Sequence, residues 1–160
     1  MAIPLNVREF LNQSGREWDE VHHRPAYSAQ REAAITHVPG RLWAKTVVCI
    51  ADGEAIIAVL PAHYRLDLER LRIEAKATNV RLAREAEIGA LYHDCETGAA
   101  PPLGPLYNER VFVDESLTTD PEITFHAGTH TDAVRMRYAD FAMLVKPLVA
   151  RFANSPVRAH

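Results

Sequence analysis

The chain has 160 residues, of which 48% are hydrophobic and 24% are charged. This length and balance are typical of a globular domain with a full hydrophobic core, so we expect residues 1–160 to form one domain. The formal net charge of -3 gives no overall attraction to nucleic acid, and a polyanionic partner would therefore have to bind a local basic patch.

The first part of the chain predicts two helices separated by a strand. Apolar residues at helical spacing predict a helix between Pro4 and Gly15, and WDEVHH at 18–23 predicts a brief strand. The segment SAQREAAITHVPG begins with a serine cap and ends in a Pro-Gly terminator, so we expect a second helix over residues 28–40.

A hairpin is the clearest element of the sequence. Two runs rich in β-branched residues, LWAKTVVCIA and EAIIAVLPA, flank the dipeptide Asp52-Gly53, which is favoured in tight hairpin turns. We expect two neighbouring antiparallel strands, and their apolar density indicates that they lie centrally in a sheet. The following segment, residues 66–77, has one apolar helical face and predicts a helix that packs on this sheet.

The second half of the chain predicts further strands and a closing helix. A short strand at 80–83 and a short helix at 85–94 lead into an irregular loop. Beyond the loop, RVFVDESL predicts a strand that ends at Asp114, and two further apolar segments predict strands at residues 121–128 and 133–137. Residues 138–152 predict a closing helix that is kinked or broken near Pro147, and we expect residues 153–160 to form a flexible tail.

These elements favour an α+β fold with a mixed, mainly antiparallel sheet and helices on its outside, because the strands outnumber those of a regular βαβ alternation. Rossmann and P-loop fingerprints are absent from the sequence. Cys49 and Cys95 have no CxxC spacing, which argues against zinc bound by cysteine and suits a reducing compartment. With no signal-peptide pattern and no apolar run of roughly 20 residues, we expect a cytoplasmic protein without a membrane partner.

The loop DCETGAAPPLGP at 94–105 contains three prolines, two glycines and little that can pack. Gly98 permits positive φ or close backbone approach, while Pro101 and Pro102 fix φ and remove N–H groups. Such a stiff loop can present backbone amides to a carbonyl or phosphate oxygen. A rigid crossover between a helix and a strand explains the composition equally well.

Two side chains are candidates for chemistry. Lys45 interrupts an apolar strand, where an ammonium needs a partner or an anionic ligand unless its stem reaches solvent at an edge. His130 lies in a glycine turn between two strands, where an ordinary solvated histidine is the alternative. The spacing of His126 and His130 suits a metal only on a helix, so we expect no metal. Cys95 has no identifiable base, and no other nucleophile is evident.

Several motifs, in order, resemble the YbaK/prolyl-tRNA-synthetase-associated domain family, which includes free-standing aminoacyl-tRNA deacylases and inserted editing domains. They are AKTVV at 44–48, AVLPAHYRLDLERL at 58–71, GAAPP at 98–102 as a GxxxP loop, VFVDESL at 111–117 and FHAGTH at 125–130. The resemblance extends from Tyr27 to Phe152. Each motif is weak alone, but their order and separations make the match specific.

The resemblance implies a compact domain with a curved, barrel-like mixed sheet and a pocket lined by the lysine strand, the GxxxP loop and the glycine turn. Lys45 looks like the lysine that meets the phosphate of the terminal adenosine, and Gly98 and Pro102 look like the GxxxP pair. His130 sits where several relatives keep a polar residue. Thr46, Ala99, Ala100, Pro101, Gly128 and Thr129 are the accompanying substrate-binding candidates.

The implied chemistry is hydrolysis of the ester between an amino acid and the 3′-terminal ribose of mischarged tRNA, with no cofactor. Loop amides orient the carbonyl, and water attacks with help from the ribose hydroxyl. Thr46 and Ala99 depart from residues common in relatives, so alanine, serine, threonine and cysteine all remain candidate substrates. The implied partners are the tRNA 3′ end, held by a basic patch of Arg24, Arg31, Arg41 and Lys45, and a synthetase, whereas DNA is not expected.

Two other functions remain open at this stage. A non-catalytic module would use the same pocket to bind an aminoacyl-tRNA end or a nucleotide-like ligand, as the partner of a synthetase. A general hydrolase would act on another small acyl ester without needing the tRNA. Turnover, and its dependence on Lys45, distinguishes catalysis from binding.

Overall fold

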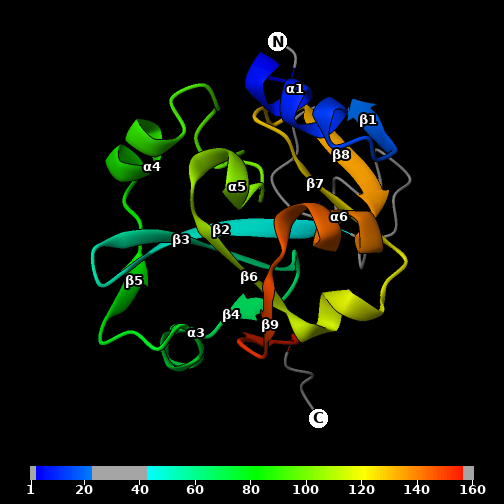
Figure 1. Ribbon diagram of the computed structural model, residues 1–160. Coiled ribbons are helices and arrows are strands. Elements are labelled where there is room, and N and C mark those ends of the chain that lie inside the picture. Colours follow the sequence, from blue (N-terminus) through cyan, green and yellow to red (C-terminus); the bar gives the residue numbers. More distant parts are fainter. Residues whose placement is uncertain (1–2, 23–42, 157–160) are drawn as a thin grey trace.

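The computed structural model describes residues 3–22 and 43–156, which form a mixed α+β fold (Figure 1). The α+β class predicted from the sequence is therefore confirmed. The helix predicted over residues 28–40 lies outside the described residues, as do Arg24, Arg31 and Arg41 of the predicted basic patch.

The predicted hairpin forms the centre of a five-stranded sheet. Strands β2 (Ala44–Ala51) and β3 (Glu54–Pro61) pair antiparallel along their whole length. Asp52 and Gly53 both have positive φ, as a tight two-residue turn requires. Three further strands complete the order β5-β2-β3-β6-β9, namely β5 (Val80–Leu82), β6 (Arg110–Asp114) and β9 (Leu148–Ala150). Strands β6 and β9 run parallel to β3, so the sheet is mixed.

A second, three-stranded antiparallel sheet has the order β1-β8-β7, with β1 at Trp18–His22, β7 at Glu122–His126 and β8 at Asp132–Arg137. A parallel bridge between Trp43 and Thr124 joins β7 to the start of β2. The short strands β4 (Arg65–Leu66) and β10 (Ala153–Asn154) pair separately. The sheet is not closed into a barrel, so the barrel-like closure expected from the family resemblance is wrong for the described strands, because they pair as three separate sheets.

Helices cover both faces of the five-stranded sheet (Figure 1). On one face, helices α1 (Leu5–Gln13) and α6 (Tyr138–Val145) and the three-stranded sheet enclose a core that includes Val7, Val59, Phe125 and Phe141. On the other face, helix α3 (Leu68–Ala75) packs through Leu71 against a second core that includes Leu60 and Phe152. A strand buried on both faces is apolar throughout, which explains the continuous apolar run of β3.

The chain around Pro147 departs from the predicted closing helix. Helix α6 ends at Val145 and Lys146 adopts a left-handed conformation, so the predicted break is confirmed. The residues after Pro147 are not helical, however, because β9 pairs in parallel with β6. Asp114 Oδ1 then accepts the backbone N–H groups of Phe152 and Ala153. The first two residues of the expected tail, Ala153–Asn154, form β10.

Helix α4 (Glu85–Leu91) was expected from the sequence and follows β5. Two short elements were not expected: helix α5 (Gly104–Tyr107), immediately after the loop, and the 3-10 helix η2 (Glu115–Thr119), after β6. Helix α5 begins at Gly104, where a Cβ atom would lie 2.3 Å from the carbonyl oxygen of Glu109. Glycine is needed there, and the close approach fixes the end of the GxxxP loop.

Candidate functional site

The GxxxP loop, residues 96–102, is hydrogen-bonded to the glycine turn, residues 127–131. The backbone N–H of Glu96 donates to the carbonyl oxygen of Gly128 at 2.7 Å, and the N–H of Gly128 donates to Ala99 O at 2.8 Å. Gly98 and Gly128 adopt φ values of +84° and +101°, which side chains disfavour. The structure thus brings together two of the three segments that the sequence assigned to the pocket.

His130 strengthens this contact with its backbone and its side chain. Its N–H donates to Glu96 Oε1, and its ring Nε2 lies 2.6 Å from the carbonyl oxygen of Thr97. A Cβ atom on Gly98 would lie 3.4 Å from His130 Cε1. The imidazole therefore lies against the glycine of the GxxxP loop. Glu96 and Thr97, absent from the predicted site, provide the oxygen atoms that bind His130.

The loop packs more than its composition suggested. Five consecutive residues, Ala99 to Leu103, are buried. Ala100 packs beside Val48 of β2 and Tyr92. The expectation that this loop contains little that can pack is therefore wrong, because small side chains and proline rings fill the space against β2. The loop is both a rigid crossover and a candidate binding element.

Two amide groups within residues 98–102 are available to a ligand. The N–H of Ala99 donates to Glu96 O, and Pro101 and Pro102 have no N–H. Among residues 3–22 and 43–156, the N–H groups of Gly98 and Ala100 have no hydrogen-bond partner. Ala100 is 7% exposed, and a buried N–H without a partner is costly. These two donors are therefore suited to an oxygen atom of a ligand.

Strand β2 has a gap along the edge that faces the loop. The carbonyl of Trp43 accepts from Ala62 beyond β3, whereas the carbonyl of Val48 accepts from Ala83 on the opposite side. Peptide groups of alternate residues point to the same side of a strand. The N–H and carbonyl groups of Thr46, like the carbonyl of Val48, therefore point away from β3. The bridge at Trp43 and the ladder with β5, which begins at Cys49, leave Thr46 between them. In the described part of the chain, the Thr46 peptide faces no partner strand.

Lys45 lies on the opposite face of β2 from Thr46, beside its ladder partner Leu60. Its side chain is half-buried, and both burial and the positive charge of Arg65 lower its pKa from the ordinary value. No ion pair involves either Lys45 or Arg65 within the residues that the structure describes. The structure therefore shows two neighbouring cations without a carboxylate, but no direct contact between Lys45 and the GxxxP loop.

Aromatic rings connect the start of β2 to the glycine turn. The ring of Trp43 lies 5.6 Å from that of His126, which lies 5.9 Å from that of His130. His126 is the last residue of β7, the strand bridged to β2. The three segments predicted to line the pocket are thus contiguous, although Lys45 itself is not part of these contacts.

Cys95 lacks the properties of a nucleophile. Burial raises the pKa of its thiol to about 11, and the thiol contacts the hydroxyl of Tyr107. Cys49 is fully buried, and burial raises its pKa to about 12. Both are free cysteines, and both thiols are protonated near neutral pH.

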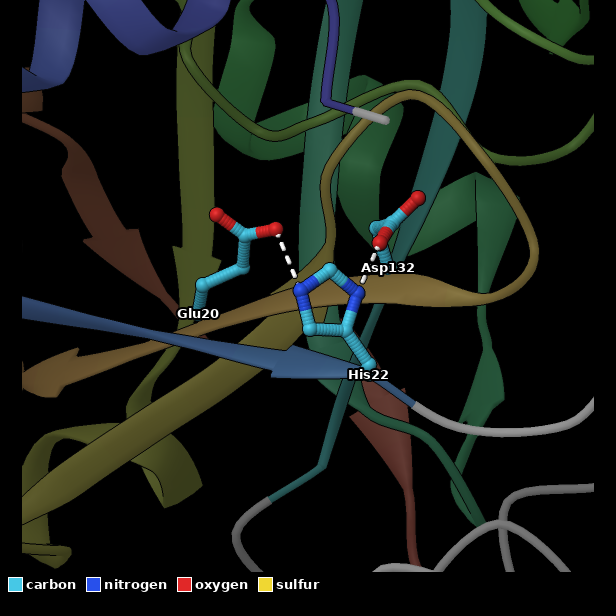
Figure 2. A group of neighbouring side chains, drawn as sticks. All are labelled: Glu20, His22 and Asp132. Atoms are coloured by element: carbon cyan, nitrogen blue, oxygen red, sulfur yellow. Dashed lines mark ion pairs between the residues drawn. The ribbon is translucent and has the colours of Figure 1, made fainter. Parts of the chain in front are cut away.

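A second cluster, which the sequence did not suggest, lies beside the glycine turn. Glu20 and His22 of β1 meet Asp132, the first residue of β8 (Figure 2). Among the described residues, these three form a group whose ligand atoms lie close enough together to hold a metal ion. No local pattern could have revealed this cluster, because His22 and Asp132 are 110 positions apart in the sequence. The pairing of β1 with β8 makes them neighbours.

The family of aminoacyl-tRNA editing domains matches residues 23–144 of the chain. A proline–tRNA ligase from Nitratidesulfovibrio vulgaris is 28% identical over 135 residues, which cover 78% of this chain but 23% of the ligase. The chain thus spans about a quarter of the length of this relative.

Two solved structures share the fold. The hypothetical protein APE2540 has a TM-score of 0.82 at 22% identity, covering 93% of this chain and 99% of that one. A protein proposed to be a trans-editing enzyme for prolyl tRNA synthetase has a TM-score of 0.79 at 22% identity, covering 94% and 96%. None of the described helices has the length and apolar character needed to cross a membrane. The family match over most of the chain shows that the protein belongs to the aminoacyl-tRNA editing domains.

Proposed function

We propose that the protein hydrolyses the ester of tRNA mischarged with a small amino acid, namely alanine, serine, threonine or cysteine, and that it acts in trans. Membership of the editing-domain family supports the reaction class. The observation that carries the proposal is the pair of free N–H groups, on Gly98 and Ala100, in a loop held rigid by the glycine turn. A rigid pair of donors can stabilise charge on a carbonyl oxygen without first reorganising.

In the proposed reaction, a water molecule adds to the ester carbonyl carbon. The carbonyl oxygen gains negative charge while it accepts hydrogen bonds from Gly98 and Ala100. The bond from carbon to the ribose oxygen then breaks, the ribose oxygen takes a proton, and the products are the free amino acid and uncharged tRNA. The neighbouring ribose hydroxyl assists the water, which is consistent with the protonated thiol of Cys95.

Lys45 and Arg65 are the proposed site for a phosphate of the terminal nucleotide. Burial and the positive charge of Arg65 lower the pKa of Lys45, and no carboxylate among the described residues pairs with either cation, so an anion that binds between the two stabilises them. Thr46 lies on the same strand at the gap in its edge, where its free peptide group is available to the same nucleotide. The phosphate thus fixes the tRNA end, and the loop fixes the ester.

Pro102 and Pro101 keep the loop rigid, and Ala99 and Ala100 keep the space beside it small. Gly128 and Thr129 form the turn that supports the loop, and His130 holds that turn against Thr97. A narrow pocket admits small amino acids and excludes larger ones by overlap, whereas it discriminates weakly among amino acids of similar size.

We further propose that the tRNA 3′ end is the principal partner and that a synthetase is a second partner in the cytoplasm. The similarity to one segment of a proline–tRNA ligase supports this pairing, because that segment shares a chain with synthetase domains.

A deacylation panel tests the proposal. The purified protein is mixed with tRNAs charged with alanine, serine, threonine or cysteine, and with correctly charged prolyl-tRNA, and release of the amino acid is measured for wild type and Lys45→Ala. We expect release of one or more small amino acids by wild type and a loss of at least tenfold in the variant. Absence of release by a protein that still binds the charged 3′ end would contradict the proposal and support the binding module.

A further inference from the structure

His22 lies between two carboxylates. Its Nε2 is 2.6 Å from Glu20 Oε2, and its Nδ1 is 2.5 Å from Asp132 Oδ1 (Figure 2). Glu20 also pairs with Arg8 of helix α1, at 2.6 Å. An imidazole placed between two carboxylates can form an ion pair with each of them through its two ring nitrogens. The contacts therefore connect α1 and β1 to the first residue of β8.

Asp132 is 1% exposed, and a buried carboxylate is costly unless charged or polar partners surround it. Its Oδ2 accepts a hydrogen bond from the hydroxyl of Thr129 at 2.6 Å. The hydroxyl oxygen of Thr129 in turn accepts the backbone N–H groups of Thr131 and Asp132. Asp132 therefore holds the Thr129 hydroxyl in place, and this hydroxyl binds the backbone at the end of the glycine turn.

The arrangement suits a network of ion pairs better than a metal ion. Glu20 approaches Nε2 and Asp132 approaches Nδ1, so the carboxylates lie at different nitrogens of one ring. A single ion binds one nitrogen of an imidazole, and the other nitrogen commonly donates to a carboxylate. One ion could not use the present positions of both carboxylates through this ring.

We propose that Asp132, held by His22 and Glu20, is a positioning residue for the deacylation reaction, an inference that rests on the proposed function. Asp132 fixes Thr129, and the residues on either side of Thr129 bind the GxxxP loop: Gly128 through its N–H and carbonyl, and His130 through its N–H and ring. Loss of the Asp132 carboxylate therefore displaces the loop amides without removing any group that touches the substrate.

The test compares Asp132→Asn and Thr129→Val with wild type. Small displacements of positioned groups cost up to roughly a hundredfold in rate, so we expect kcat to fall at least tenfold in each variant while KM changes less than threefold. Because Thr129→Val removes the donor and Asp132→Asn replaces the carboxylate by a weaker, uncharged acceptor, both act on the same link, and the double variant should lose no more than the larger single loss. Thr129→Ser keeps the hydroxyl and should retain most of the activity.

Asp19→Asn is the matched control. Asp19 pairs with Arg135 across the same two strands, at 3.2 Å, but lies on the exposed side of the ladder and has no link to the turn. We expect its kcat to equal that of wild type. Should Asp132→Asn fail to fold, His22→Gln replaces it, because the His22 side chain is 65% exposed, and a reduced kcat is again expected.

A second readout does not depend on turnover. In 1H–15N spectra, the amide signals of Gly98, Gly128 and His130 should shift in Asp132→Asn and Thr129→Val, and remain in place in Asp19→Asn. Unshifted signals with wild-type kcat would overturn the positioning role while leaving the deacylase function intact. Shifted signals in a protein whose wild type releases no amino acid would instead contradict the proposed function alone.

Discussion

His130 Nε2 lies 2.6 Å from the carbonyl oxygen of Thr97, so a side chain of the glycine turn holds the backbone of the GxxxP loop. A carbonyl oxygen only accepts hydrogen bonds, and Nε2 must therefore be the donor. A nitrogen that already holds its hydrogen in this contact cannot accept a proton from water. His130 therefore supports the loop through Nε2, and we propose that it holds the free amides in place during the reaction.

The first prediction follows from this contact. His130→Ala removes the ring but keeps the backbone N–H that donates to Glu96, so the protein should fold. We expect kcat to fall roughly tenfold, because the loop amides lose a fixed position. His130→Gln can restore a donor to Thr97 and should recover part of the loss. Deacylation kinetics of both variants provide the measurement, and wild-type kcat in His130→Ala would contradict the assigned role.

The second prediction concerns Gly98, whose φ is +84° and whose added Cβ would lie 3.4 Å from His130 Cε1. Gly98→Ala should lower kcat at least tenfold. Gly53→Ala is a matched control, since Gly53 has a φ of +86° with nothing within 4 Å of the added atom. Both variants carry a similar backbone strain of about 1 kcal/mol, so similar melting temperatures are expected. Equal kcat values in the two would show that the loop has no role in the reaction.

The third prediction concerns the stability conferred by Lys45. Its pKa is lowered in the folded protein, first by burial and then by Arg65, so the unfolded chain binds more protons between the folded pKa and the ordinary lysine pKa of 10.5. The free energy of unfolding should therefore rise with pH through this interval. Below it, the charged lysine destabilises the fold.

Lys45→Met removes this penalty. We expect a higher melting temperature than wild type near pH 7, and a difference that shrinks as the pH approaches 10.5, with deacylation lost throughout. Urea unfolding at several pH values measures the trend. A variant that is less stable than wild type at pH 7 would show that Lys45 has a stabilising partner.

The fourth prediction concerns Cys95, whose pKa is raised to about 11 by burial. Cys95→Ala should keep kcat within threefold of wild type, because a protonated thiol is a poor nucleophile. Alkylation by iodoacetamide should be slow at pH 7.5 and accelerate as the pH approaches 11. Complete loss of turnover in a folded Cys95→Ala protein would point instead to covalent catalysis.

Local patterns in the sequence predicted most of the fold. The turn Asp52-Gly53 and its flanking apolar runs determine the hairpin within twenty residues, and the helical spacing of Val7 and Leu11 determines α1. The segment after Pro147 was assigned to a helix because its apolar residues continue the helical spacing. Pairing with β6, a contact between residues far apart in the sequence, decides its conformation instead.

The candidate site was predictable only in part, for the same reason. Gly98 and Gly128 are visible in the sequence as positions that tolerate positive φ. The hydrogen bonds that join them run through Glu96, which no local pattern distinguishes from a solvated acidic residue. Asp114, within the VFVDESL motif, shows the opposite case: it binds the backbone of Phe152 and Ala153, so this part of the resemblance marks a structural contact.

The site lies where two separately paired sheets meet, joined by the bridge between Trp43 and Thr124. The loop and Thr46 belong to the five-stranded side, whereas His126 and the glycine turn extend from the three-stranded side. If the proposed reaction takes place here, a slight tilt of one sheet against the other would change the spacing between Thr46 and the glycine turn without replacing any side chain of the proposed site. Core residues under the smaller sheet, such as Ile123 and Val134, therefore offer a route to altered amino-acid preference from a distance.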